Sequence, residues 1–419
     1  MTPLIFAFKL LIAVPVALVL ALTSIWYIWE SGNTVLYDSF AQKMFAGIEN
    51  YGLLAIPLFM LTGELMNEGG MTSRLINAAR VFVGGFRGGL AYINLLTNML
   101  MAAIIGSATA QIAVMTRAMV PAMEEEGYDK GFAAATTAAG GLLAPVIPPS
   151  MMFVIYGVLA QIPIGEMFIA GIIPGLMLTV SFALVIALIG LYQEFPKGEW
   201  LSPKQAYLAI LHCLPAAMIP LAIIGGILFG IATPTESAAI ASLIAFLLGW
   251  LVYKELKPKD LFKMFRRTAI NASMIVFMIA AANVFGWVII YEALPQKIAA
   301  LITSVTQDPF VFLLIINVIL LFVGMLIDGI AAIILITPIL LPIAITSYGI
   351  SPYQFGIVMC LNLALGLLTP PVGIGLYIAS AMSGVSTMRI LKSLWPFLLA
   401  VMGILLLLSY FPSLSTALL

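Results

Sequence analysis

The chain has 419 residues, of which 63% are hydrophobic and only 9% are charged, and its formal net charge is zero. This composition excludes a water-soluble domain and indicates a polytopic helical membrane protein. The balanced charge gives no sign of a nucleic-acid partner, and two cysteines with a single histidine do not suggest a metal centre.

Apolar stretches long enough to cross a bilayer recur along the chain, since a crossing needs about 20 residues. The expected spans are residues 4–28, 50–66, 131–160, 165–192, 207–231, 236–253, 268–291, 354–382 and 389–411. The first ends in aromatic residues and has no convincing cleavage site, so we interpret it as a span and not as a signal peptide. Residues 71–87 and 295–307 mix charged with apolar positions and predict amphipathic helices at the membrane surface.

Two further regions, about 89–123 and 310–345, are too long for one ordinary span and too short for two spans with a turn. Each has glycine and polar residues near its middle, such as Gly106 and Ser107 in the first and Gly324 and Asp328 in the second. Two half-length helices that meet at the bilayer midplane fit this pattern. Such a re-entrant hairpin is allowed only where protein or water shields the backbone. A single long, kinked helix is the alternative.

Two expected spans carry nearly the same motif, GLLAPVIPPS at 141–150 and GLLTPPVG at 366–373. Proline removes a backbone donor and obstructs a helical turn, so both helices should be interrupted at mid-membrane. The interruption frees carbonyl oxygens, and sodium is a cation that takes such oxygens as ligands. A packing kink is the alternative, because proline is common in membrane helices.

The two halves share one order of elements: span, span, surface helix, hairpin, broken span, span. Six basic residues between Lys254 and Arg267 place that stretch in the cytoplasm. Counting spans from there puts the N-terminus inside, the C-terminus outside, and the two hairpins on opposite sides. Residues 1–206 and 232–419 are therefore expected to be inverted repeats joined by a helix at 207–231. Inverted repeats with broken helices indicate a secondary transporter whose site lies at the repeat interface.

Asp328 is the strongest candidate side chain, because a charge near the bilayer centre is costly unless it is paired. The alternative is a carboxylate that caps the half-helix after it. Earlier in the chain, the sequence Thr233-Pro234-Thr235-Glu236 predicts a helix start with a capping box.

Four stretches resemble the large membrane subunit of the tripartite ATP-independent periplasmic (TRAP) transporters. They are AIPLFMLTGELMNEGG (55–70), GYDKGFAAATTAAGGLLAPVIPPSMMFVIYG (127–157), ATPTESAA (232–239) and NLALGLLTPPVGIGLY (362–377). The resemblance covers most of the chain. It implies an all-α, multi-pass protein of the bacterial inner membrane that imports a small organic anion by an elevator mechanism.

The resemblance also implies the partners and the coupling ion. Sodium drives the transport, with no organic cofactor and no enzymatic reaction. A periplasmic substrate-binding protein delivers the anion, which belongs to the carboxylate, sialic acid or sulfonate class. A small four-helix membrane subunit and membrane lipid surround the chain. A stand-alone sodium–carboxylate symporter of similar architecture is the alternative function.

The family pattern implies two sodium sites, each shared by a hairpin tip and a broken span. The first consists of Gly106, Ser107, Gly141, Ala144 and Val146, and the second of Gly324, Asp328, Gly366, Thr369 and Val372. The substrate is expected between the tips, near Ser107, Thr109, Pro145, Pro148 and Pro370. The family usually has Ser-Gly-Ser at the first tip and Asp four residues later. Here Ile105 and Gln111 replace the first serine and the aspartate, so a hydroxyl and a carboxylate are missing.

Overall fold

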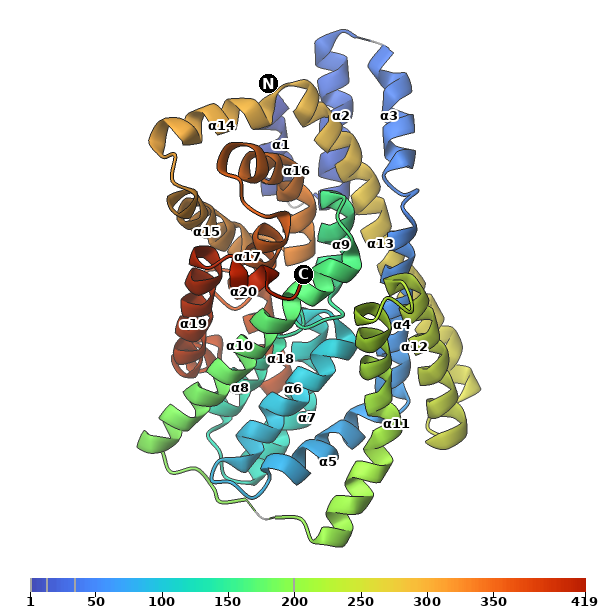
Figure 1. Cartoon of the computed structure of the whole chain (residues 1–419), viewed down its shortest axis with the longest axis vertical. Helices are drawn as coiled ribbons and strands as arrows, with labels where there is room; N and C mark the ends of the chain where they lie inside the picture. The colour runs from blue at the N-terminus through green and yellow to red at the C-terminus, as the bar shows by residue number, and fades with distance from the viewer. Residues whose placement is uncertain (1, 13, 34, 199) are drawn as a thin grey trace.

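The computed structural model describes residues 2–12, 14–33, 35–198 and 200–419, and helices form nearly all of its regular structure (Figure 1). In these residues, seven helices are long and apolar enough to cross a membrane, or eight if one bent pair forms a single span. The seven are α10 (Ile164–Tyr192), α11 (Pro203–Leu228), α12 (Pro234–Leu247, continued by the π-helical turn η2, Leu248–Val252), α13 (Pro258–Tyr291), α15 (Pro309–Leu326), α16 (Gly329–Tyr348) and α19 (Thr387–Tyr410). The short α20 (Ser413–Thr416) follows α19.

The beginning of the chain differs from the expected single span at 4–28. The structure has two helices there, α1 (Thr2–Leu11) and α2 (Val16–Ser31), which pack against each other. Pro15 is the N-cap of α2, and a proline cannot continue the backbone hydrogen bonds of a preceding helix. Figure 1 shows α1, which begins at Thr2, at the end of the molecule that carries α14 (Leu294–Val305) and away from the basic α5 (Met71–Val83). The prediction that the N-terminus lies on the basic side is therefore wrong.

The bent pair lies just downstream. Helix α3 (Val35–Ala46) is followed by the short 3-10 helix η1 (Tyr51–Leu54) and α4 (Ala55–Glu68), with a bend of 51° between the two parts. The span expected at 50–66 thus corresponds to α4 and η1, and α3 extends it toward the N-terminus. Helix α4 packs against α12 and α13, and α13 packs against α2 and α3.

The two amphipathic helices lie across opposite ends of the molecule, α5 at one end and α14 at the other (Figure 1). Helix α5 buries one stripe of side chains and leaves its polar stripe exposed. The buried residues are Met71, Leu75, Ala78 and Ala79. Helix α5 packs against both α6 and α11, so it links the first hairpin region to the helix between the halves.

Both proposed hairpin regions consist of two helices. Helices α6 (Gly89–Ile105) and α7 (Ala108–Glu125) meet at Gly106 and Ser107, and α15 and α16 meet at Ile327 and Asp328. Gly106 has φ +61, a conformation that glycine adopts without the strain that a Cβ would cause. Helices α15 and α16 have 18 and 20 residues and are each long enough, by length and composition, to cross a membrane. Length therefore does not exclude two spans in the second region, 310–345, and the argument from its length is wrong.

Both proline motifs interrupt their helices. Helix α8 (Lys130–Gly141) stops at the first motif, and α9 (Met151–Ala160) begins after it. Helix α17 (Pro352–Gly366) stops at the second motif, and α18 (Ile374–Ser383) follows. Each interruption begins directly after the glycine that opens the motif.

The packing of the two halves follows one scheme. Helices α6 and α7 pack against α8, and α15 and α16 pack against α17. The second helix of each pair also contacts the other half, because α7 packs against α18 and α16 packs against α9. Each interrupted helix is thus enclosed by hairpin helices of both halves.

A polar contact recurs at the same place in each half. Asn94 of α6 donates its amide to the Thr137 hydroxyl of α8 at 2.7 Å, and Asn362 of α17 donates to the Asn317 side chain of α15 at 2.9 Å. Thr137 and Asn362 each lie four residues before the glycine of their motif, Gly141 and Gly366. All four polar side chains are buried, so each contact gives an amide donor a partner where water does not reach it.

The capping box predicted at Thr233 is confirmed. The Thr233 hydroxyl accepts from the Glu236 amide, and the Glu236 carboxylate accepts from the Thr233 amide, with Pro234 as the first residue of α12. The contact accounts for Glu236 as a helix-start residue.

An ion pair outside the apolar segments joins the two halves. Asp129 is the N-cap of α8, and its carboxylate pairs with Arg389 at the start of α19 at 2.5 Å. Burial acts to raise the pKa of Asp129, but the hydrogen bonds from Arg389 and the Phe132 amide outweigh it, so the pKa lies below the ordinary 3.8. The ionised carboxyl therefore stabilises the fold above pH 3.8, and this contribution is lost as the pH falls through the lowered pKa.

We expect Asp129→Asn to lower the thermal unfolding midpoint modestly at neutral pH, by the equivalent of about 1 kcal/mol or less, because asparagine keeps the cap and loses only the exposed ion pair. The difference from the wild type should shrink as the pH falls below the ordinary carboxyl range. Thermal unfolding in detergent across pH measures it. A difference that stays constant with pH would show that the charge of Asp129 is not the cause.

Candidate functional site

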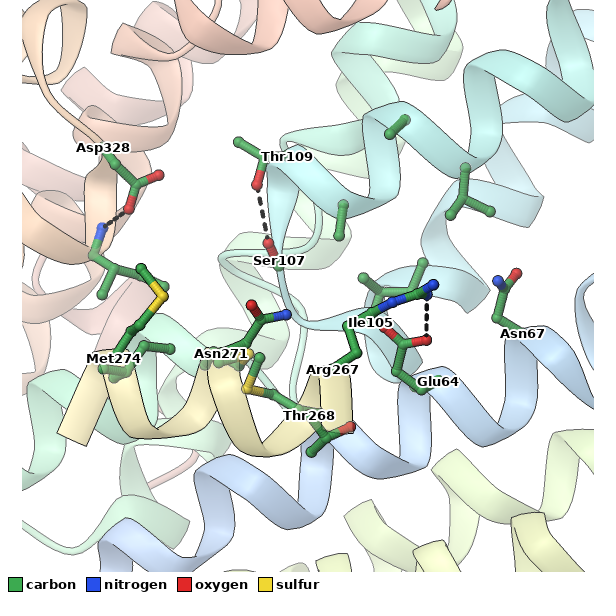
Figure 2. A pocket seen from close by; sticks show the side chains of 18 of the residues that line it. Glu64, Asn67, Ile105, Ser107, Thr109, Arg267, Thr268, Asn271, Met274 and Asp328 are labelled. Atoms are coloured by element: carbon green, nitrogen blue, oxygen red, sulfur yellow. Dashed lines mark hydrogen bonds and ion pairs between the residues drawn. The ribbon is translucent and has the colours of Figure 1, made fainter. Parts of the chain in front are cut away.

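A cavity of about 660 Å³ separates α4 and α13 from the tips of both hairpin regions (Figure 2). Ser107 and Thr109 line it from the first tip, and Asp328 lines it from the second. The facing wall carries Glu64 of α4 and Asn271 of α13. The cavity therefore brings together the two junctions that the sequence singled out, and it adds a polar wall that the sequence did not predict.

The added wall contains an ion pair. The Arg267 guanidinium of α13 donates to the Glu64 carboxylate of α4 at 2.9 Å, and Figure 2 shows the pair at the side of the cavity away from Asp328. The sequence had placed Arg267 in a cytoplasmic loop, but α13 already begins at Pro258, so Arg267 is helical. The sequence did hold a signal that Arg267 belongs to a helix that faces the cavity. Arg267, Asn271 and Met278 are spaced so that they lie on one helical face.

The first tip is held against the first interrupted helix by backbone contacts. The Gly106 carbonyl accepts a hydrogen bond from the Met151 amide at 3.3 Å, and a Cβ on Gly106 would lie 3.2 Å from the Pro149 carbonyl oxygen. The Ser107 and Thr109 hydroxyls lie 3.2 Å apart and face the cavity. Gly106 thus lets the tip approach the start of α9, while Ser107 and Thr109 offer oxygen atoms to a ligand.

The remaining residues of the predicted first sodium site are fully buried behind this tip. Gly141 lies against the first turn of α7, where an added Cβ would be 3.5 Å from the Ala108 carbonyl oxygen. Within the described chain, the Ala144 carbonyl accepts no backbone hydrogen bond. The Val146 carbonyl oxygen instead lies beside Gly171 of α10, at 2.7 Å from the position of an added Cβ. The Ala144 carbonyl is therefore left without a backbone partner, whereas the Val146 carbonyl faces α10.

The predicted second site has the same construction. The Met325 carbonyl accepts from the Gly373 amide at 3.3 Å, as the Gly106 carbonyl does from Met151. Gly324 and Gly366 bring the backbones of α15 and α17 into direct contact, since a Cβ on Gly366 would lie 2.4 Å from the Gly324 carbonyl carbon. The Thr369 hydroxyl donates to the Leu365 carbonyl at 2.8 Å.

The second interruption is more open than the first. Val372 is 37% exposed, whereas Ala144 and Val146 have no exposed surface. Oxygen atoms at the second site are therefore closer to the outside of the chain than those at the first.

Asp328 combines the two roles that the sequence left open. Its carboxylate accepts from the Ile330 amide at 3.0 Å and so caps α16. It also lines the cavity on the opposite side from Glu64 (Figure 2). No group of three or more His, Cys, Asp or Glu side chains suited to a metal occurs among the described residues. A cation at the tips would thus be held mainly by backbone and hydroxyl oxygens.

The three prolines expected near the substrate do not line the cavity. The Pro145 carbonyl accepts from the Ser150 hydroxyl at 2.7 Å, within the interruption. Pro148 faces apolar residues of α10 and α11 at a separate small void, and Pro370 is exposed. The prolines shape the interruptions, whereas Ser107 and Thr109 reach the cavity.

The model of the DctM component of the tripartite ATP-independent periplasmic transporters matches residues 4–414. The chain belongs to this family. It is a transporter permease and not an enzyme.

Characterised relatives of this permease differ in what their names say they carry. The chain is 36% identical to the sialic acid TRAP transporter large permease protein SiaM of Vibrio cholerae, over 89% of this chain and 87% of SiaM. It is 35% identical to the C4-dicarboxylate TRAP transporter large permease protein DctM of Pseudomonas aeruginosa, over 91% and 89%. It is 36% identical to the isethionate permease protein DctMQ of Oleidesulfovibrio alaskensis, over 97% of this chain and 64% of DctMQ.

Solved structures share the fold of the permease at low sequence identity. The YdaH transporter of Alcanivorax borkumensis superposes with a TM-score of 0.67 at 14% identity, covering 91% of this chain and 89% of YdaH. MtrF of Neisseria gonorrhoeae gives 0.62 at 12% identity, covering 91% and 85%. The permease is thus an all-helical, multi-span membrane protein with a transporter fold.

Gln111 stands at the position where the resemblance described above implies an aspartate. Its amide nitrogen donates to the Asn98 backbone carbonyl at 2.8 Å and to the Gly140 carbonyl at 3.2 Å, so the orientation of the amide is fixed. The amide oxygen is buried and has no hydrogen-bond partner in the described part of the chain. Gln111 therefore ties α7 to α6 and α8 and leaves one buried neutral oxygen without a partner.

Proposed function

We propose that this permease is the translocating subunit of a sodium-driven importer of a small organic anion in the bacterial inner membrane. Relatives named for sialic acid, C4-dicarboxylates, isethionate and 2,3-diketo-L-gulonate support an organic anion as the substrate. The observation that carries the sodium proposal is the pair of proline-interrupted helices, each facing a hairpin tip across a glycine contact. Unwound backbone inside a membrane is tolerated where it lines a site, and its carbonyl oxygens suit sodium.

Residues 1–206 and 232–419 are, in this proposal, inverted repeats with re-entrant hairpins at 89–123 and 310–345, joined by the helix at 207–231. Three features support it: the reciprocal packing of α7 on α18 and of α16 on α9, the matching contacts of Asn94 and Asn362, and α5 and α14 at opposite ends (Figure 1). Helices α2, α4, α12 and α13 form a second packed group. Elevator transport moves the hairpins and broken helices against this second group, and the cavity lies between the two.

The sodium ligands in this proposal are mostly backbone oxygens. The first site uses Gly106, Ser107, Gly141 and Ala144, and the second uses Gly324, Gly366, Thr369 and Asp328. Val372 completes the second set, whereas the Val146 carbonyl, which lies beside Gly171 of α10, is left out of the first. A neutral amide in place of a carboxylate leaves the first site with less negative charge, so the first ion should bind more weakly than the second.

The partners follow from the three-component family. A periplasmic binding protein delivers the anion, and a small four-helix membrane subunit packs against α2, α4, α12 and α13. The relative named DctMQ supports a close association of the M and Q components.

Uptake by proteoliposomes tests the proposal. The complex is reconstituted with the binding protein, and uptake of a radiolabelled anion is compared in external sodium, external potassium and without the binding protein. The proposal predicts uptake only with sodium and the binding protein together. Equal uptake in potassium would contradict sodium coupling, and equal uptake without the binding protein would favour a stand-alone symporter.

Arg267 is the cation that the substrate meets in the cavity, in this proposal. It is the only Lys, Arg or His among the described residues that line the cavity. In this proposal its ion pair with Glu64 opens, and the guanidinium then pairs with a carboxylate of the substrate. We expect Arg267→Gln to raise KM for the transported anion at least about tenfold, since a charge-assisted hydrogen bond contributes about 1.5–3 kcal/mol. Initial rates of uptake across anion concentrations measure it.

Arg266 provides the matched control. It is the adjacent residue of α13, it is exposed, and it does not line the cavity. Arg266→Gln should leave KM unchanged. If both variants change KM equally, the effect comes from the general positive charge at this end of α13 and not from contact with the anion.

A further inference from the structure

A second polar cavity of about 640 Å³ lies between α5 and α11, apart from the anion cavity. Ser73, Asn77 and Arg80 line it from the polar stripe of α5, and Gln205 and His212 line it from α11. These side chains recur at spacings of three, four and seven residues, so each set lies on one face of its helix. Two stripes of hydrogen-bond donors thus face each other across the cavity.

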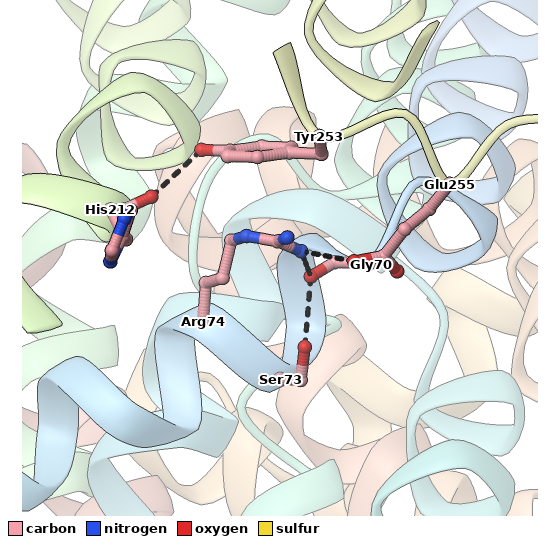
Figure 3. A network of polar contacts seen from close by, with 6 residues as sticks. All are labelled: Gly70, Ser73, Arg74, His212, Tyr253 and Glu255. Atoms are coloured by element: carbon pink, nitrogen blue, oxygen red, sulfur yellow. Dashed lines mark hydrogen bonds and ion pairs between the residues drawn. The ribbon is translucent and has the colours of Figure 1, made fainter.

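A closed network occupies one end of this cavity (Figure 3). Arg74 donates to the Glu255 carboxylate at 2.8 Å and to the Gly70 carbonyl at 2.5 Å, and it stacks on the Tyr253 ring at 3.9 Å. A Cβ on Gly70 would lie 1.7 Å from the Glu255 carboxylate, so glycine makes room for the pair. The charges of Arg74 and Glu255 therefore neutralise each other.

Arg80 has no such partner. No ion pair or hydrogen bond of its guanidinium occurs among the described residues, although the side chain is half-buried in the cavity wall. A partly buried guanidinium without an ion-pair partner favours a bound anion, and the one carboxylate in the described cavity lining, Glu255, is already paired with Arg74. The Asn77 and Gln205 amides and the His212 imidazole provide further donors for several oxygens of one group, as a phosphate offers.

The rim of the cavity is apolar. Leu201 and Leu208 line it, and Leu208 is 40% exposed. Exposed Tyr207 and Leu211 of α11 continue this apolar surface beyond the cavity. A free phosphate has no apolar surface to bury against this rim, whereas a phospholipid can bury its acyl chains against it.

We propose that the cavity binds the phosphate of an anionic phospholipid from the leaflet that faces the cytoplasm. The phosphate pairs with Arg80 between the two stripes, and the acyl chains lie along α11. Helix α5 packs against both α11 and α6, so the lipid sits at the joint between the first hairpin region and the helix that links the halves. A bound lipid stabilises the packing of α5 against α6 and α11. Because this packing links the first hairpin region to α11, the transport rate should rise with the anionic lipid content of the membrane.

Native mass spectrometry of the complex in phosphatidylglycerol and phosphatidylcholine mixtures tests the proposal. The wild type should retain phosphatidylglycerol, and Arg80→Gln should lower the retained amount at least about tenfold, as expected for the loss of a charge-assisted contact. Arg87→Gln is the control, because Arg87 is exposed near the same end and does not line the cavity. It should retain the lipid. Should Arg80→Gln fail to fold, His212→Ala removes a donor from the other helix and should also weaken retention.

Three outcomes would overturn the proposal. Equal retention by the wild type, Arg80→Gln and His212→Ala would show that the lipid binds elsewhere. Displacement of phosphatidylglycerol by inorganic phosphate, with phosphate bound equally well in detergent alone, would assign the cavity to a soluble anion. Loss of the lipid whenever the small membrane subunit is present would show that the cavity is a protein contact.

Discussion

In Gly366→Ala, sodium-dependent uptake should fall by at least about tenfold and the thermal unfolding midpoint should drop. The added methyl group would lie 2.4 Å from the Gly324 carbonyl carbon and 2.6 Å from its Cα, so only a shift of one backbone can make room. Overpacking of this kind costs about 1–3 kcal/mol. The shift also separates the second tip from the second interrupted helix, where we place a sodium ion. Uptake rates and thermal unfolding in detergent measure the two effects.

Gly403→Ala is the control for this substitution. Gly403 lies in α19, where an added Cβ would meet no described atom within 4 Å beyond its own stretch of helix backbone, and alanine is the better helix former by about 1 kcal/mol. This variant should transport normally and unfold at an equal or higher temperature. Normal uptake and stability in Gly366→Ala would show that α15 and α17 have room between them, which contradicts the close glycine contact.

In Asp328→Asn, the sodium concentration for half-maximal uptake should rise at least about tenfold. Asparagine caps a helix about as well as aspartate, so α16 should keep its start and lose only the charge. A carboxylate close to a bound cation favours it electrostatically, and an amide oxygen replaces only part of that effect. Uptake measured across sodium concentrations at a fixed anion concentration gives the shift.

Asp308→Asn is the control for this substitution, because it also removes the charge of an N-cap aspartate in the same hairpin region but not at the tip. Asp308 is the N-cap of α15, where its carboxylate accepts from the Phe310 and Val311 amides, at the opposite end of that helix from the tip. It should leave the sodium dependence unchanged. If Asp328→Asn also leaves it unchanged, Asp328 serves only as the cap of α16.

Local chemistry accounts for the features that the sequence predicted well. The interruptions at 142–150 and 367–373 follow from proline, which acts within a single turn. The capping box of Thr233 and Glu236 depends on four consecutive residues. The expected break near Gly106 and the helix start at Asp328 are equally local, since glycine and aspartate are residues that end and begin helices.

Tertiary packing decided what the sequence missed. The run at 4–28 is a partial exception, because the proline that divides it, Pro15, is a local signal, and only the packing of α1 back onto α2 is tertiary. Arg267 follows a run of basic residues that looks like a loop, yet α13 begins earlier and packs against α4, which brings Arg267 to Glu64. The position of Val146 beside Gly171 depends on how α10 docks, which no local pattern reports.

Maps of the purified complex in sodium and in potassium test the central claim most directly. The account predicts density in sodium at both tips, beside Gly106 and Gly141 at the first and beside the Gly324–Gly366 contact at the second, with carbonyl oxygens around it, and no such density in potassium. Identical maps in the two salts would contradict the assignment of these interrupted helices as the sodium sites, as would continuous, fully hydrogen-bonded helices through the proline motifs.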